Sequence, residues 1–216
     1  MLEELLLENK ISPTKVIQIE PEQLVELNLS KNNKALAKVD LNDEKAFTDF
    51  IFKHLQDGQV GIGGYGEERS LYSRSNLFEG EEPRSVHLGI DIWTNAGTEV
   101  HCPVDATVHS YANRNVHGDY GPVIILQHDI NGFVFYTLYG HLAQKSLVGL
   151  CKGKTIQQGE NFAWLGRYEE NFHWPPHLHF QLIIDIQGFE GDYPGVCKKS
   201  EAEEYLNNCP DPSVFL

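Results

Sequence analysis

The chain lacks the cysteine patterns that mark zinc knuckles and thiol redox sites. It has four cysteines, Cys102, Cys151, Cys197 and Cys209, and no two of them form a CxxC pair. Neither a knuckle nor a redox motif is therefore indicated. In a chain of this size without paired spacings, we expect isolated reduced thiols rather than a disulfide framework.

Long apolar runs are also missing. No run approaches the ~18 residues that a membrane-spanning helix requires. The first residues, MLEELLLENKISP, place acids inside the apolar run and show neither a basic region nor a small-residue cleavage site. They do not resemble a signal peptide. We therefore expect a soluble, cytoplasmic protein, with export by another route left open.

Positive charge is scarce. The chain has 17 Lys and Arg against 31 Asp and Glu, which gives a net charge of −14. This balance argues against nucleic acid or an anionic membrane surface as the partner, because both attract basic proteins. A neutral or cationic ligand fits better. The length of 216 residues predicts one domain with at most a modest extension, and the oligomeric state stays open.

Residues 1–80 are interpreted as an N-terminal extension followed by a glycine-rich linker. Apolar residues recur at helical spacing over 21–27 and 43–55, and Asn42 or Asp43 can cap the second helix. The stretch GQVGIGGYG, residues 58–66, predicts a flexible connection rather than a helix or a strand. A phosphate loop is the rival interpretation, but no Gly-Lys-Ser/Thr follows.

The segment after these glycines, GYGEERSLYSR, leaves two interpretations open. Tyr65, Arg69, Tyr72 and Arg74 either line or gate a groove, or they belong to a packed linker. A related hypothesis is that the whole extension covers the groove as a lid.

Residues 81–216 have the pattern of an antiparallel β domain. Short runs rich in Val, Ile, Phe and Tyr alternate with turn residues such as Asp129-Ile-Asn-Gly. Convincing helix signals are absent from this part. The fold class predicted for the chain is mainly β, with a small helical or mixed extension. The expected strands cover 87–93, 99–104, 106–111, 123–128, 133–139 and 179–186.

In two of the expected strands the polar side chains lie at alternate positions, and thus share one parity along the strand. In HLGIDIW, His87 and Asp91 flank Gly89, while the alternate residues are apolar. In HLHFQL, His177, His179 and Gln181 share one parity. Because side chains alternate across a strand, each segment presents one polar face and buries the other. Such faces on a rigid sheet suit a metal site.

The residue types in these segments are ordinary zinc ligands. Catalytic zinc sites use three protein ligands, drawn from imidazole nitrogens and carboxylate oxygens, together with a water. The two strands supply such a set, and a third segment, YTLYGHL, adds His141 after an apolar run. Each motif alone is weak, since a histidine in a strand is more often structural. Together, on the right parity in one domain, they predict a zinc centre.

Five segments in order, RSVHLGIDIW, GTEVHCPVDATVHS, YGPVIILQHD, YTLYGHL and PPHLHFQL, resemble the lysostaphin/LytM-type zinc metallopeptidases of peptidase family M23. The resemblance covers roughly residues 84–186. It implies that His87, Asp91 and His179 bind Zn²⁺, and that His177 and His141 flank the attacking water and the substrate carbonyl. It also implies a LytM-like fold of the duplicated-hybrid-motif type, with a sheet-lined groove, and peptide bonds of peptidoglycan as substrates.

The chemistry agrees with these roles. A zinc ion lowers the pKa of a bound water and polarises a carbonyl, and histidine can accept a proton near neutral pH. We favour His177 as the base, although the sequence does not order His177 and His141. Since a leader and a basic patch are missing, a soluble muropeptide or another small peptide is an alternative substrate.

The other histidines of this part are interpreted as structural. His101, His109, His117 and His128 are expected to be surface or satisfied structural residues. His173 precedes Trp174-Pro-Pro, whose prolines predict a rigid turn before the HLH segment.

Two functions of other classes remain as alternatives. The first is a non-catalytic relative that regulates or binds another cell-wall hydrolase. The second is a carrier or phosphotransfer domain with a phosphorylatable histidine, a function in which Asp91 would have no role.

Overall fold

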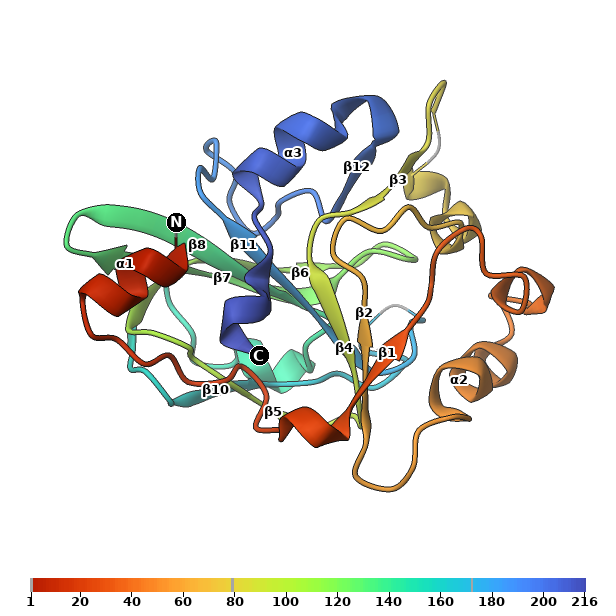
Figure 1. The fold of residues 1–216 in the computed structure, drawn as a ribbon, viewed down its shortest axis with the longest axis horizontal. Helices are drawn as coiled ribbons and strands as arrows, with labels where there is room; N and C mark the ends of the chain where they lie inside the picture. Colours follow the sequence, from red (N-terminus) through yellow and green to blue (C-terminus); the bar gives the residue numbers. More distant parts are fainter. Residues whose placement is uncertain (1, 79, 172) are drawn as a thin grey trace.

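An eight-stranded sheet runs through the computed structural model, which describes residues 2–78, 80–171 and 173–216 (Figure 1). Its neighbouring strands pair antiparallel, except that β1 and β2 are parallel. In spatial order the strands are β1 (Leu24–Leu27), β2 (Val60–Gly63), β4 (Ile90–Trp93), β11 (His177–Ile183), β8 (Phe133–Gly140), β7 (Gly121–Ile130), β6 (Ala106–Arg114) and β9 (Thr155–Ile156).

Two small antiparallel sheets and several short helices accompany the large sheet. One small sheet joins β10 (Asn161–Trp164) to β5 (Glu99–His101), and the other joins β12 (Val196–Lys198) to β3 (Arg84–His87). The α-helices are α1 (Leu2–Glu8), α2 (Glu44–Phe52) and α3 (Ala202–Asn208). The 3₁₀ helices are η1 (Pro21–Gln23), η2 (Leu36–Lys38), η3 (Leu71–Arg74), η4 (Asn76–Phe78), η5 (Gln144–Leu147), η6 (Lys199–Glu201) and η7 (Pro212–Phe215).

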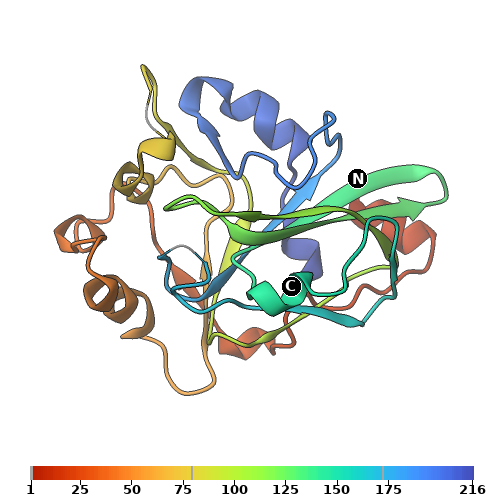
Figure 2. The ribbon, with the colours of Figure 1, turned by 180° about the vertical axis from the view of Figure 1, so that it is seen from behind.

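The α-helices lie at the periphery of the molecule, whereas η7 packs on the sheet through Phe215, whose ring lies against those of Phe135 and Phe180 (Figure 1). Helices α1 and α2 sit at opposite ends of the molecule, as the front and back views both show (Figures 1 and 2). Helix α3 lies beside β12 (Figure 1). None of the helices in the described ranges has the length and apolar character needed to cross a membrane.

The mainly β fold predicted from the sequence is confirmed. The expected runs 106–111, 123–128 and 133–139 lie within β6, β7 and β8, which form a continuous antiparallel meander. Helix α2 also forms where the sequence predicted it, and Asp43 caps it by accepting a hydrogen bond from the backbone N–H of Ala46 at 2.9 Å. Turn signals and alternation were thus sufficient for these elements.

The expected single strand 87–93 is wrong. The chain forms β3 up to His87, breaks at Leu88 and Gly89, and resumes as β4 at Ile90. A Cβ on Gly89 would lie 2.5 Å from the carbonyl oxygen of Phe180. The chain therefore passes too close to β11 at this point for any residue with a side chain, and it changes from one sheet to another.

The flexible connection expected for the glycine-rich stretch is wrong for residues 60–63. These residues form β2, which pairs with β4 on one side and β1 on the other. Bare backbone is needed here, because a Cβ on Gly61 would lie 2.4 Å from Cδ1 of Leu27 and 3.3 Å from Cβ of Trp93. The division of the chain at residue 80 stays a prediction, although residues 24–27 and 60–63 belong to the large sheet.

Two helix expectations were also wrong. Residues 21–27 form the short η1 and then β1, because their leucines pair along β2 instead of coiling. Helix α3 forms in the part where no helix was expected. It buries no residue completely, but Ala202, Tyr205 and Leu206 pack against the second cluster at helical spacing, a pattern that the sequence interpretation missed.

Three apolar clusters enclose the centre of the sheet. The largest includes Ile90, Ile92, Leu178 and Phe180, which are the apolar neighbours of the candidate ligands on β4 and β11. A second lies against α3, β3 and β12. The third joins α2 to the sheet through Phe47, Trp93 and Trp174. Strands β4 and β11 are therefore held from several sides.

Candidate metal centre

The pairing of β4 with β11 places two of the candidate ligands opposite each other. His179 is the register partner of Asp91, and its Nδ1 lies 3.2 Å from Asp91 Oδ1. His87 reaches the same oxygen from the end of β3, with Nε2 at 3.2 Å from Asp91 Oδ1 and 2.9 Å from His179 Nδ1. One ligand atom from each of the three residues thus lies within 4.8 Å of the others, and all three side chains are buried.

The hydrogen bonds on the outer side of these rings fix which nitrogens face the cluster as acceptors. His87 Nδ1 donates to the carbonyl oxygen of Gly64 at 3.0 Å. His179 Nε2 donates to Gln181 Oε1 at 2.9 Å, and the Gln181 amide is oriented because its Nε2 donates to the carbonyl of Pro194. Each ring therefore carries its proton outside, and the inner nitrogens present lone pairs, as metal ligands do.

His177 continues this arrangement. Its Nδ1 donates to the carbonyl oxygen of Pro175 at 2.8 Å, so Nε2 faces Asp91 Oδ1 at 4.0 Å with a lone pair. Its ring stacks on Trp93, with centroids 3.9 Å apart and planes inclined by 19°. The sequence put His177 and His179 on one face of a strand, and the structure brings both to the cluster.

His141 lies on the other side of His177, with ring centroids 4.0 Å apart. It directly follows β8 and has a left-handed backbone, with φ of 62°, which a residue with a side chain rarely adopts. Its Nδ1 is buried and has no hydrogen-bond partner among the residues that the structure describes. A strained residue with an unused ring nitrogen beside the cluster is suited to a substrate or water contact.

The charges of the cluster favour a cation. Burial opposes ionisation of Asp91, but the positive charge of Arg69 on Oδ2 outweighs it and holds the pKa of this carboxyl well below its usual range. Burial lowers the pKa of His87 and of His177 to about 4. Burial, with His177 and His179 beside it, lowers the pKa of His141 well below its usual value. An anionic carboxylate among neutral imidazoles is the donor set that zinc takes.

A cavity of about 220 Å³ opens onto the cluster. His87, Asp91, His141, His177 and His179 all line it. The lining also includes the aromatic Tyr72, Phe78, Tyr120, Trp174, Phe189 and Tyr193 and the aliphatic Leu71, Leu77 and Val196. A substrate segment placed here would contact aromatic rings as well as the five candidate site residues.

Several residues around the cluster were not assigned by the sequence. Trp93 was read only as part of a strand, and Tyr120, whose ring centroid lies 5.2 Å from that of His179, had no signal. Arg69 and Tyr72 were left between groove and packed linker. Both are buried and line the cavity. The side chain of Arg74 lies outside the described residues.

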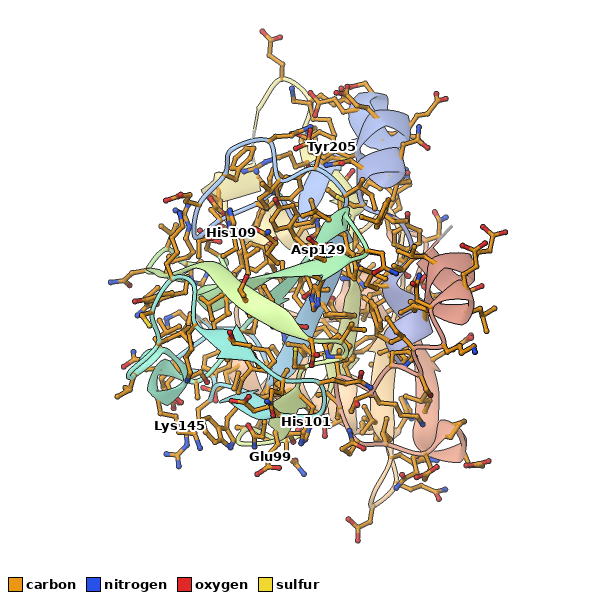
Figure 3. The ribbon with its side chains drawn as sticks, turned by 90° about the vertical axis from the view of Figure 1, so that its left-hand side faces the viewer. Glu99, His101, His109, Asp129, Lys145 and Tyr205 are labelled. Atoms are coloured by element: carbon orange, nitrogen blue, oxygen red, sulfur yellow. The ribbon has the colours of Figure 1, made fainter. Side chains whose placement is uncertain are left out.

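The other histidines are not among the residues that line the cavity. His128 is buried, with Nδ1 donating to the carbonyl of Asp105 and Nε2 against the hydroxyl of Thr137, so it is a satisfied structural residue as expected. His101 and His109 lie well apart on the molecule (Figure 3). The rings of His117 and His173 are 5.3 Å apart.

Residues 85–190 match the model of peptidase family M23, a span that contains all five candidate site residues. These residues belong to peptidase family M23. A second comparison agrees: 99 residues are 35% identical to a protein of Haemophilus influenzae described as an uncharacterized metalloprotease, covering 46% of this chain and 19% of that one. The chain thus spans about a fifth of that relative. The match of residues 85–190 to the M23 family supports a metallopeptidase.

Solved structures similar to this chain include the catalytic domain of lysostaphin from Staphylococcus simulans, at 22% identity over 63% of this chain and 87% of that one, with a TM-score of 0.41. A zinc-containing peptidase from Vibrio cholerae is 26% identical over 45% of this chain and 27% of that one, with a TM-score of 0.37. The M23 segment begins at residue 85, so β1, β2 and the segment with Arg69 lie outside it.

Proposed function

We propose that this chain is a zinc-dependent metalloendopeptidase in which His87, Asp91 and His179 bind the Zn²⁺ ion. The observation that carries the proposal is the convergence of lone pairs. His87 Nε2 and His179 Nδ1 both face Asp91 Oδ1 at 3.2 Å, with their protons directed outward. Without a cation, three acceptor atoms at this distance repel one another, and a zinc ion relieves that repulsion.

His177 and His141 are the proposed catalytic residues. A bound zinc ion activates water for attack and polarises the carbonyl of the scissile bond. His177 Nε2 faces the cluster with its lone pair, and His141 Nδ1 has no partner within the described ranges. One would accept the proton of the water, and the other would donate a hydrogen bond to the oxygen that gains charge. We keep His177 as the base, because its ring orientation is fixed by Pro175 and Trp93.

The proposed substrate is a peptide, either a stem or cross-bridge peptide of peptidoglycan or a related small peptide. The support is the family, together with a cavity of about 220 Å³ whose size and aromatic lining favour a compact chain segment over a bulky folded partner. The net charge of −14 agrees with a substrate that is not strongly anionic.

The test combines metal analysis with digestion. Purified wild-type protein should hold about one zinc per chain and cleave members of a panel of muropeptides and oligoglycine peptides. His179→Ala should lose both the metal and the cleavage. His177→Ala and His141→Ala should keep the metal and lose cleavage, while His109→Ala, on β6, should keep both.

Each departure from this pattern has a distinct meaning. Protein without zinc, even after incubation with the metal, would refute the metallopeptidase. Zinc with no cleavage of any peptide would favour the non-catalytic regulator. Loss of zinc in His177→Ala or His141→Ala would contradict the division between ligands and catalytic residues.

A further inference from the structure

Arg69 carries a buried positive charge in direct contact with one of the candidate ligands, Asp91. Its side chain is about 1% exposed, and its Nη1 donates to Asp91 Oδ2 at 2.5 Å. Its Nε donates to Glu67 Oε2 at 2.7 Å, and Nη1 also lies 3.3 Å from the hydroxyl of Tyr72. An arginine in this position is costly to bury, so its partners must compensate.

The contact with Arg69 divides the two oxygens of Asp91 between two tasks. Oδ2 faces Arg69, whereas Oδ1 faces His87 Nε2 and His179 Nδ1. A carboxylate with one oxygen engaged in this way can offer only the other to a metal. Ligand carboxylates are commonly oriented by such outer hydrogen bonds.

Arg69 is itself held firmly from the N-terminal part of the chain. Its backbone N–H donates to the carbonyl of Ser85, in β3, at 2.8 Å. Its partner Glu67 accepts a second hydrogen bond, from the backbone N–H of Leu29 at 3.0 Å. The guanidinium also packs closely against a glycine, because a Cβ on Gly63 in β2 would lie 3.2 Å from Nη2. The arrangement therefore depends on residues outside the M23 segment.

We propose that Arg69 is a positioning residue for Asp91, which holds Oδ2 so that the carboxylate presents Oδ1 alone to the metal. The inference rests on the proposed zinc site. It assigns part of the site to the segment before residue 85, and it gives the strands of that segment a role in metal binding.

The sign of the effect separates positioning from simple charge. Removing a cation beside a metal site, by charge alone, strengthens the binding of Zn²⁺, because like charges repel. Loss of an outer partner that orients a ligand weakens binding, typically by about 10 to 100-fold. A fall in zinc affinity after the loss of Arg69 is therefore the opposite of what a purely electrostatic role predicts.

The experiment uses the full chain with Zn²⁺ or Co²⁺ as the probe. Zinc affinity is measured by competition with a chromophoric chelator, and the coordination of Co²⁺ by its visible absorption, which weakens as the coordination number rises. The variants are Arg69→Met and Arg69→Lys, with Arg114→Met as control, since Arg114 pairs with Asp119 and Asp192 instead of a candidate ligand.

For Arg69→Met we expect about 10 to 100-fold weaker zinc binding and a weaker Co²⁺ spectrum, since both oxygens of Asp91 become free to coordinate. Arg69→Lys should lie between Arg69→Met and wild type, because it keeps the charge but cannot hold both Asp91 and Glu67 in the same geometry. Arg114→Met should match wild type in both measurements.

The outcomes that overturn the inference are separate from those that overturn the function. If wild type binds zinc and Arg69→Met binds it equally or more tightly with an unchanged Co²⁺ spectrum, the positioning role is wrong and the zinc site stands. If wild type binds neither metal, the proposed function fails first. Should Arg69→Met not fold, Arg69→Lys carries the test, and wild-type affinity and spectrum in that variant would overturn the proposal.

Discussion

Phe47 connects the N-terminal helix α2 to the candidate site, and its replacement by alanine gives a strong prediction. Its side chain is completely buried. The ring lies with its centroid 6.3 Å from that of Trp93 and 6.0 Å from that of Trp174. Trp93 in turn stacks on His177. Phe47→Ala would therefore leave a cavity one residue away from a proposed catalytic histidine.

The expected magnitude follows from what is removed. A buried Phe→Ala change costs about 3–5 kcal/mol in the free energy of unfolding. The upper part of that range applies here, since two aromatic pairs, each worth about 0.5–1.5 kcal/mol beyond area burial, are lost together. Against a total stability of about 5–15 kcal/mol for a typical domain, this is a large fraction. Phe50 on the same helix is only partly buried, and Phe50→Ala should cost less than half as much.

Urea denaturation followed by far-ultraviolet circular dichroism measures both variants. Peptide cleavage by Phe47→Ala should also fall more than its zinc affinity, because the disturbed Trp93 supports His177, which is not a proposed ligand. A cost below about 1 kcal/mol for Phe47→Ala, or equal costs for the two phenylalanines, would refute the claim that α2 is part of the core behind the site.

Three further predictions concern other parts of the molecule. Gly89→Ala should abolish zinc binding in a metal analysis, because its Cβ would lie 2.5 Å from the Phe180 carbonyl oxygen and 3.0 Å from the ring of His179. The control variant Gly80→Ala should bind zinc normally, because its Cβ would meet no atom of the described residues closer than 3.5 Å. Burial lowers the pKa of His128 to about 4, below the 6.5 of an exposed histidine, so the stability linked to its neutral form is complete above pH 6.5 and is lost as the pH falls toward 4. The free energy of unfolding should fall by about 3 kcal/mol over this pH range. The urea midpoint of wild type should therefore decrease more steeply with falling pH than that of His128→Gln, and equal pH dependence in the two proteins would contradict this role of His128. Zinc at about 1,000 times its Kd should stabilise the chelated protein by about 4 kcal/mol in thermal unfolding, and an unmoved melting temperature would count against a folded-state zinc site.

The side-chain alternation in the sequence predicted the part of the site that lies within one strand. His177, His179 and Gln181 share a parity, and the structure places His179 against both Asp91 and Gln181. Alternation works here because β11 is continuous and its neighbours are in register. Turn signals likewise located the β6, β7 and β8 meander, whose contacts are local in sequence.

Alternation could not show that the chain leaves one sheet for another between His87 and Asp91. That break comes from the close approach of Gly89 to the carbonyl of Phe180, a contact between residues far apart in sequence. The same limit explains β2. Glycine is depleted in strands in general. Here Gly61 is needed because the side chains of Leu27 and Trp93 occupy the space that a Cβ would take, and no local sequence pattern reveals that contact. Arg69 was missed as a partner of Asp91 for the same reason.

The division of the candidate ligands between two sheets has a mechanical consequence. His87 comes from β3, which pairs with β12, whereas Asp91 and His179 come from the large sheet. All four cysteines are free. A bound ion would therefore tie the small sheet to the large one, as a disulfide does in other proteins. The parts most sensitive to metal removal should be β12 and the adjoining α3, so that hydrogen exchange in the C-terminal segment reports occupancy of the site from a distance.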